Sequence, residues 1–153
     1  LSTGLRTSNI TKLKWDWVNL ARETLTVPVG SFKQKRSHTI PLAPTAVAIL
    51  KRQIGRHPER VFTYKVTNKK KGDYYRPVGK IRTDAWHKAL ARAEIKDFRV
   101  HDLRHTFASH HIMNGTPLVV LQALGGWKDP KMVLRYAQQN TNSLRKYEVN
   151  SCV

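Results

Sequence analysis

Apolar residues along this chain recur mainly at helical spacing, and β-branched residues gather instead in three short segments. Spacings such as that of Val47, Leu50 and Ile54 predict helices with a buried side, because positions three and four apart share one face. The predicted helices cover residues 1–14 with a break near Gly4, 44–54, 81–94, 101–114, 118–124 and 131–139. Trp86, on the apolar side of its helix, is expected in the core. Residues 24–29, 37–42 and 60–64 are expected to be strands, the first two joined as a basic antiparallel hairpin.

Turn residues divide the last third of the chain into three short helices. Gly115 ends the first of them, because glycine readily adopts the left-handed conformation found at helix ends. Thr116 is expected to cap the second helix, and Gly125-Gly126-Trp127 to break it. Asp129 is expected to cap the third helix, which carries Tyr136.

The helix that begins at His101 separates cations from apolar residues. His101, Arg104 and His105 lie three and four positions apart and therefore point the same way. Leu103 and Phe107 mark a different face, which we expect to be buried. Cations gathered on one face repel each other, and a bound anion would offset that repulsion. The pattern favours a phosphate-binding site.

The charge of the chain narrows the class of partner. Lys and Arg number 28 against 10 Asp and Glu, so the formal net charge is +18 and the sequence pI is about 10.5. Basic surface gains affinity for nucleic acid by releasing the counterions condensed on phosphates. A membrane-surface role is the rival interpretation, but the sequence has no run of about eighteen apolar residues and no dominant basic amphipathic helix. We therefore expect a nucleic-acid partner and no membrane.

The length and the cysteine content limit the number of domains and the cellular environment that we expect. The chain has 153 residues, enough for one domain with a real core. Its one cysteine, Cys152, excludes an intrachain disulfide and a thiolate metal cluster, which favours a reducing, intracellular setting. Because the chain begins Leu1-Ser2-Thr3-Gly4 without a methionine or a signal-like apolar segment, we interpret it as a piece of a longer protein.

Three short motifs in a fixed order carry a resemblance to a known family. They are His101-x-x-Arg104, Leu124-Gly125-Gly126-Trp127 and Arg135-Tyr136-Ala137. No single motif is specific, but the ordered set resembles the catalytic domain of tyrosine recombinases, the phage integrase family. The resemblance implies an α+β domain over residues 1–140, mostly helical, with a small three-stranded antiparallel sheet at one edge. Residues 141–153 would then be a tail able to dock on a neighbouring subunit.

The resemblance also implies a metal-independent transesterification of DNA that uses no cofactor. The implied catalytic residues are Arg6, Lys33, His101, Arg104, Trp127 and Tyr136. Tyr136 would be the nucleophile, forming a covalent 3′-phosphotyrosyl link, while Arg6 and Arg104 would clamp the phosphate. Lys33, at the hairpin tip, would protonate the departing 5′ hydroxyl. His101 would assist as base or hydrogen-bond partner, and Trp127 stands where many relatives have histidine.

Further basic residues are expected to contact double-stranded DNA. They are Lys35, Arg36, Lys69, Lys70, Lys71, Arg76 and His105. Recombinases that resemble this chain act as tetramers and clamp DNA with a separate amino-terminal domain, and we expect the same assembly here, in the cytoplasm of a bacterial host. Asn9 departs from the family pattern, which usually has glutamate at that position.

Other interpretations of these residues stay open at this point. Taken singly, Trp127 and Tyr136 are typical packing residues, and Lys33 with its neighbours is typical of a solvated charge run. The two helices around Gly115 also fit a helix-turn-helix, although Gln122 is the one side chain of the second helix suited to reading bases. A type IB topoisomerase would share the chemistry. A metal-dependent nuclease would need a carboxylate cluster that the few acidic residues do not form.

Overall fold

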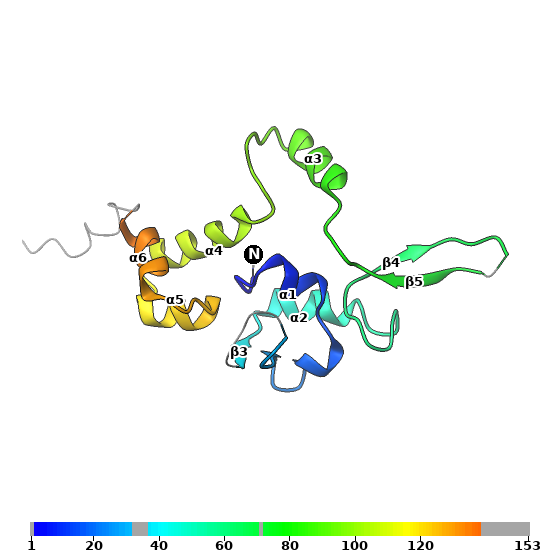
Figure 1. Ribbon diagram of the computed structural model, residues 1–153, viewed down its shortest axis with the longest axis horizontal. Coiled ribbons are helices and arrows are strands. Elements are labelled where there is room, and N and C mark those ends of the chain that lie inside the picture. The colour runs from blue at the N-terminus through cyan, green and yellow to red at the C-terminus, as the bar shows by residue number, and fades with distance from the viewer. Residues whose placement is uncertain (1, 32–36, 71, 139–153) are drawn as a thin grey trace, which may run out of the picture.

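The computed structural model describes residues 2–31, 37–70 and 72–138, which form a mixed helical and stranded fold. The helices are α1 (Thr7–Thr11), α2 (Pro44–Lys51), α3 (Thr83–Arg92), α4 (Asp102–Met113), α5 (Leu118–Gly125) and α6 (Pro130–Gln138), with a 3-10 turn at Trp15–Trp17. The strands are β1 (Val18–Asn19), β2 (Thr24–Val27), β3 (His38–Pro41), β4 (Thr63–Val66) and β5 (Tyr74–Pro77). Helices predominate and the antiparallel sheet is small, which confirms the predicted α+β class. The helices α4, α5 and α6 gather at one end of the molecule, and the β4–β5 hairpin extends from the other (Figure 1).

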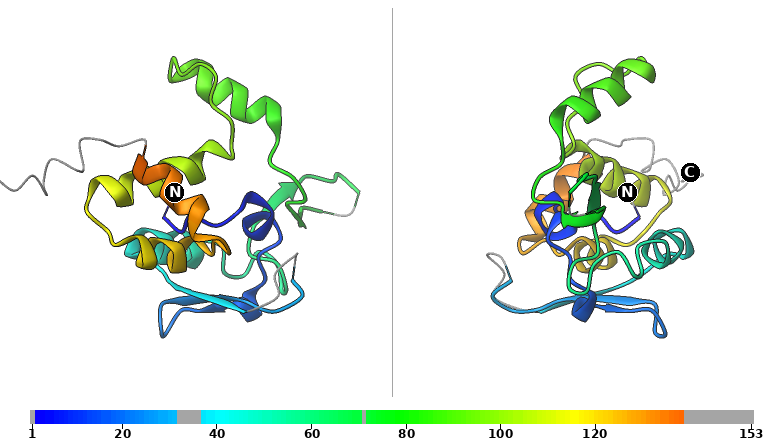
Figure 2. Two further views of the ribbon diagram at one scale, coloured as in Figure 1. Left: turned by 60° about the vertical axis from the view of Figure 1, so that its left-hand side comes forward. Right: turned by 90° about the vertical axis from the view of Figure 1, so that its right-hand side faces the viewer.

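The three-stranded sheet has the order β1-β2-β3, and both strand pairs are antiparallel. Leu25 and Val27, at alternate positions of β2, are fully buried, as expected for a sheet with one face on the core. The sheet lies along the lower edge of the molecule in both views of Figure 2. The strands predicted at residues 24–29 and 37–42 are confirmed, although each is shorter than predicted.

The strand predicted at residues 60–64 is wrong in its place and in its partner. The strand here is β4, which begins at Thr63 and pairs with β5 in a separate hairpin, while β1 supplies the third strand of the sheet. The sequence pattern does not predict β5, because lysines and glycines nearby hide the strand preference of Tyr74 and Tyr75. Every residue of β5 is exposed.

The first core lies between α1, the sheet and α2. Its most deeply buried residues are Leu13, Leu25, Val27, Ile40 and Val61. The helix predicted over residues 1–14 is wrong in length, because Gly4 has a positive φ of 57° before α1 and Lys12 leaves helical angles after it. Ile54, predicted as core, is 59% exposed, because α2 ends at Lys51 and the helical phase does not continue.

The second core joins α4, α5 and α6. Its buried residues are Phe107, Ala108, Ile112, Leu121, Trp127 and Val133. Gly115 has a φ of 76° after α4, which confirms the predicted helix end. The cap predicted for Thr116 is wrong: its hydroxyl lies 2.9 Å from Nδ1 of His111, and α5 begins without a side-chain cap. Asp129 Oδ1 accepts a hydrogen bond at 2.9 Å from a backbone N–H in the first turn of α6, which confirms that cap.

Helix α3 stands apart from the other described helices (Figure 1). No residue of α3 is buried, so the core position predicted for Trp86 is wrong. The indole Nε1 of Trp86 donates to the carbonyl of Phe98 at 3.0 Å, and the two ring centroids lie 6.1 Å apart. Trp86 therefore fastens α3 to the segment that leads into α4. None of the helices in the described ranges is long and apolar enough to cross a membrane.

Candidate active site

Arg104 lies at the centre of the site, where α4 meets the amino-terminal segment. Its side chain is buried, and Nη1 donates a hydrogen bond to the carbonyl of Gly4. The other terminal nitrogen, Nη2, is buried without a hydrogen-bond partner among the described residues. The guanidinium carbon lies 4.2 Å from the centre of the Trp127 ring. A buried cation with an unused donor is suited to bind an anion such as phosphate.

A second cation lies close to Arg104. Burial, with the charge of Arg6 as a further cause, lowers the pKa of Arg104 to about 10, so the guanidinium remains charged at neutral pH. Arg6 itself occupies the N-cap position of α1 and is half-buried. Two neighbouring guanidinium groups repel each other, and an anion bound between them would relieve that repulsion.

Gly4 allows the amino-terminal segment to approach α4 closely. Its φ is +57°, and a Cβ at this position would lie 2.4 Å from the ring of Phe107. Both the backbone angle and the contact therefore require glycine. This approach brings the Gly4 carbonyl to Arg104 and places Arg6, two residues later, beside the same site.

The turn between α5 and α6 holds Trp127. Gly126 adopts the left-handed conformation, and a Cβ on Gly125 would lie 1.7 Å from the indole ring. Gln122 Nε2 donates to the backbone carbonyl of Trp127 at 3.1 Å. The side chain that would read bases in a helix-turn-helix thus folds back on its own turn. Trp127 is buried in the second core, and its ring also supports Arg104.

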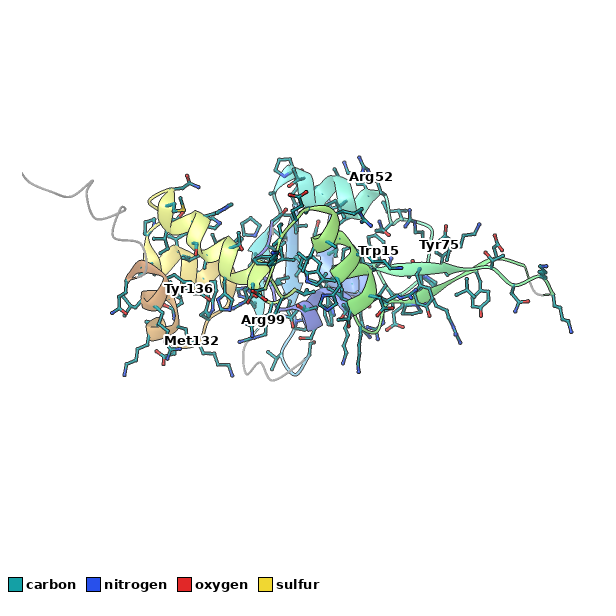
Figure 3. The ribbon with its side chains drawn as sticks, turned by 90° about the horizontal axis from the view of Figure 1, so that it is seen from above. Trp15, Arg52, Tyr75, Arg99, Met132 and Tyr136 are labelled. Atoms are coloured by element: carbon teal, nitrogen blue, oxygen red, sulfur yellow. The ribbon has the colours of Figure 1, made fainter. Side chains whose placement is uncertain are left out.

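Tyr136 projects from α6 toward α4. Its hydroxyl oxygen lies 2.7 Å from Nδ1 of His105, and its ring centroid lies 5.8 Å from that of Trp127. Partial burial raises the pKa of Tyr136, while the charges of Arg104 and Arg135 oppose the rise. Figure 3 places Tyr136 in the helical group at one end of the molecule. A phenol with a raised pKa needs a base if it is to act as a nucleophile at neutral pH.

His101 and His105 form a pair beside the tyrosine. Their ring centroids lie 5.1 Å apart and the rings meet edge to face. Desolvation is the main cause that lowers the pKa of His101, and the charges of His105 and Arg104 add to it. The sequence favours His101 for catalysis and His105 for DNA contact, but His105 is the one hydrogen-bonded to the Tyr136 hydroxyl. The shared helix face predicts the pair, and the packing of α6 on α4 decides which member meets the tyrosine.

His38 belongs to the site, although sequence reasoning misses it. It is the first residue of β3, and its Nε2 lies 3.2 Å from the carbonyl oxygen of Leu124 near the end of α5. A Cβ on Gly126 would lie 3.0 Å from the same ring. Burial is the main cause that lowers the pKa of His38, the charge of Arg104 adds to it, and the hydrogen bond to Leu124 opposes it. No motif marks this residue, and the one available signal is its place in the basic hairpin.

The acidic residues near the site have separate local partners. Asp102 accepts hydrogen bonds from the backbone and the guanidinium of Arg99, which hold the pKa of its carboxyl at about 2. Asp129 caps α6. In the parts of the chain that the structure describes, no group of three His, Cys, Asp or Glu residues is placed to hold a metal ion.

Comparison with known proteins identifies the family. A family model described as the phage integrase family matches residues 1–143 of this chain. The chain belongs to the phage integrase family. The integrase of Salmonella phage P22 is 43% identical to it over 151 residues, covering 96% of this chain and 39% of that protein. A tyrosine recombinase of Thermosipho africanus is 32% identical over 125 residues, covering 80% of this chain and 41% of that protein. The chain thus spans about two fifths of the length of these relatives.

Solved structures support the same fold. The catalytic domain of the bacteriophage HP1 integrase matches with a TM-score of 0.60 and 27% identity, covering 99% of this chain and 79% of that chain. An integrase of the Tn1549 transposon, in complex with a circular intermediate DNA, matches with a TM-score of 0.68 at 15% identity, covering 96% of this chain and 55% of that chain. At that identity the second likeness concerns the fold alone.

The residues expected in catalysis and in DNA contact fall into three groups. The fold brings together Arg6, His101, Arg104, His105, Trp127 and Tyr136. Four of the expected residues, Lys33, Lys35, Arg36 and Lys71, lie outside the described residues. Lys69, Lys70 and Arg76 belong to the β4–β5 hairpin, whose Tyr75 lies in Figure 3 on the other side of the molecule from Tyr136. Asn9, which stands where the family usually has glutamate, is buried in α1.

Proposed function

We propose that this chain is the catalytic domain of a site-specific DNA recombinase, an integrase that breaks and rejoins DNA through a covalent 3′-phosphotyrosyl intermediate. One observation carries the proposal: the Tyr136 hydroxyl, hydrogen-bonded to a histidine, lies near a buried arginine with one nitrogen that has no hydrogen-bond partner in the described part of the chain. The net charge of +18 favours double-stranded DNA as the substrate. We assign this chemistry to residues 1–140 and a subunit-docking role to the tail, 141–153.

The scissile phosphate would bind between Arg6 and Arg104. Two guanidinium groups neutralise the non-bridging oxygens as negative charge develops on them in the transition state. Nη2 of Arg104 is already desolvated, so it needs little reorganisation to donate to a phosphate oxygen. Trp127, 4.2 Å from the guanidinium carbon, would fix the orientation of that group, and His101 would donate to the same phosphate.

In the cleavage step the Tyr136 oxygen would attack phosphorus as the bond to the 5′ oxygen breaks. The departing 5′ oxygen takes up a proton, which we assign to Lys33 in the hairpin between β2 and β3. A general acid of this kind contributes roughly 10² to 10⁴ in rate. The 5′ hydroxyl of a second strand then attacks the phosphotyrosine and rejoins the DNA. The covalent link conserves the energy of the broken bond, so the step needs neither a nucleotide cofactor nor a metal ion.

The β4–β5 hairpin would contact DNA away from the cleavage point. Tyr64 lies opposite Arg76 and Val66 opposite Tyr74, so these four side chains share one face of the ribbon. Tyr64 and Tyr74 are exposed, and Lys69 and Lys70 follow in the connection between the strands. A two-stranded ribbon fits the major groove of B-DNA, where cations and phenols meet phosphates and bases. We also propose that Lys35, Arg36 and Lys71 contact DNA phosphates.

A larger assembly would complete the recombinase. We propose that a tetramer of the whole protein acts on DNA, with a separate amino-terminal domain closing the clamp, in the cytoplasm of a bacterial host. The share of 39% that the chain covers in the P22 integrase leaves room for such a domain.

Incubation with supercoiled DNA in the presence of a chelator tests the proposed function. We expect nicked or relaxed DNA with protein attached at the 3′ phosphate of the break. Strand transfer to a second duplex would separate a recombinase from a type IB topoisomerase, which relaxes DNA without exchange. Cleavage that leaves free ends and requires a divalent metal would overturn the proposal.

A further inference from the structure

The hydroxyl of Tyr136 is hydrogen-bonded to a histidine that the family resemblance does not place in the catalytic set. Nδ1 of His105 lies 2.7 Å from the tyrosine oxygen, and the two ring centroids lie 5.6 Å apart. The ring centroid of His101 lies 5.1 Å from that of His105. The contact joins α4 to α6, whose side chains are packed together in the second core.

The Tyr136 hydroxyl needs a nearby base to remove its proton. A phenol with an ordinary pKa near 10 is almost fully protonated at neutral pH, and partial burial raises the pKa of Tyr136 further. Its hydroxyl must therefore lose a proton while it attacks phosphorus. A base within hydrogen-bond reach of that proton is the geometric requirement for general-base catalysis.

We propose that His105, rather than His101, orients the Tyr136 hydroxyl and accepts its proton as the oxygen–phosphorus bond forms. In that step the tyrosine oxygen bonds to phosphorus, the bond from phosphorus to the 5′ oxygen breaks, and the hydroxyl proton passes to Nδ1 of His105. The 5′ oxygen takes its proton from the general acid. During rejoining the imidazolium returns the proton to the leaving tyrosine oxygen. The inference rests on the proposed function, since it assigns the base for the same nucleophile.

The surroundings of His105 suit this role. The charged and titratable groups around it are His101 at the N-cap of α4, Asp102, Arg104 and His110 on α4, Tyr136 and Arg135 on α6, and Arg99 before α4. The carboxylate of Asp102 feels the charge of His105, and a nearby anion favours the imidazolium that forms when the proton is accepted. His105 and Tyr136 also line a recess of about 540 Å³ that contains Asp102 and His110, so solvent can exchange the proton.

The sequence predicts instead that His105 contacts DNA. This role favours the charged form of the ring, whereas a base must be neutral. Binding a phosphate is favoured by the imidazolium, whereas accepting a proton requires the neutral ring with its hydrogen on Nε2. If His105 is the base, adduct formation speeds up as rising pH leaves the ring neutral, and then levels off. If His105 is a phosphate contact, DNA affinity weakens over the same pH range.

A suicide duplex that traps the covalent adduct tests the inference. We expect His105→Ala to slow single-turnover adduct formation on the order of a hundredfold at saturating DNA, with affinity changed less than threefold. Added imidazole should restore a measurable part of that rate, because a small base can occupy the vacated space. His105→Asn retains a hydrogen-bonding group but cannot take up a proton, so its rate should stay low and lose the pH dependence. His110→Ala, a control in the same recess, should react as the wild type does.

Three outcomes would overturn the role of His105. One is adduct formation by His105→Ala within threefold of the wild-type rate. Another is a fall in affinity that accounts for the slower reaction and is not rescued by imidazole. The third is removal of the pH dependence by His101→Asn while His105→Asn retains it. Should His105→Ala fail to fold, the folded His105→Asn protein still decides through its pH profile. A wild-type chain that forms no adduct would refute the proposed function itself. An adduct at Tyr136 whose rate of formation is unchanged by the His105 substitutions would refute this inference alone.

Discussion

His38 and Leu124 are joined by a contact of 3.2 Å between an imidazole nitrogen and a backbone carbonyl oxygen. The contact ties the first residue of β3 to the end of α5, and the ring also packs against Gly126. His38 begins the strand that follows Lys33 in the sequence. Leu124 lies in the last turn of α5, just before the turn that holds Trp127. The position of the indole beside Arg104 therefore depends on a residue outside the recombinase motifs.

Replacing His38 by alanine should loosen the turn before Trp127. We expect a decrease of about 1–2 kcal/mol in unfolding free energy from the missing hydrogen bond and packing. Adduct formation should slow by about tenfold, because a small displacement of a site group has a large effect on rate. Urea unfolding and single-turnover kinetics measure the two effects. Thr39→Ala, at the exposed neighbouring position, is the control, and an unchanged rate in His38→Ala would contradict the link.

The same histidine makes stability depend on pH. Its folded-state pKa lies below the ordinary value of 6.5, so the unfolded chain binds the proton more readily. Stability should therefore fall as pH decreases from about 7 and level off below the folded-state pKa. His101, whose pKa is also lowered, contributes with the same sign. Denaturation midpoints of the wild type and His38→Asn between pH 5 and 8 should converge on acidification, and a constant difference between them would refute the assignment.

Gly125→Ala tests how tightly Trp127 is held. The added methyl group would lie 1.7 Å from the indole ring, which cannot shift without moving away from Arg104. We expect a destabilisation of about 1–3 kcal/mol or more from overpacking, together with a failure to form the adduct. Gly79→Ala is the control, since a Cβ there would meet nothing within 4 Å. Equal behaviour of the two variants in thermal melts and adduct assays would show that the indole position is not critical.

DNA binding by this chain should be mainly electrostatic. If about six to ten phosphates are contacted, the slope of log affinity against log salt should lie near minus five to minus nine. Cognate and random duplexes should differ by less than about tenfold in affinity, because electrostatic contacts with phosphates do not depend on sequence. Replacing Lys69, Lys70 and Arg76 by alanine should reduce the steepness of the slope by roughly one for each phosphate that is no longer neutralised. Fluorescence titrations at several salt concentrations measure both, and a thousandfold sequence preference would contradict this expectation.

Local sequence patterns predict much of this fold. The positive φ of Gly115 and the cap at Asp129 follow from turn chemistry that needs only neighbouring residues. The β2–β3 hairpin follows from β-branched content in the same way. The conformation of each of these elements depends on residues that are close together in the sequence. A single sequence is therefore enough to predict them.

What the sequence misses depends on contacts between distant segments. The sequence places Arg104 on a cationic helix face, but its burial depends on the distant Gly4, whose carbonyl accepts a hydrogen bond from its guanidinium. The partner of Tyr136 is set by how α6 lies on α4, which spacing alone does not decide between His101 and His105. The β4–β5 hairpin escapes notice because its strand preference is weak and its lysines are typical of a loop.

The most direct test of the central claim is to locate the covalent bond. The chain is incubated in chelator with a nicked suicide duplex, the adduct is digested, and the DNA-linked peptide is identified by mass spectrometry, with Tyr136→Phe run in parallel. We predict a 3′-phosphotyrosyl link on Tyr136, and no adduct from Tyr136→Phe, which should still bind DNA with nearly wild-type affinity. An adduct formed by Tyr136→Phe at wild-type yield, or a link mapped to another residue, would contradict the assignment of Tyr136 as the nucleophile.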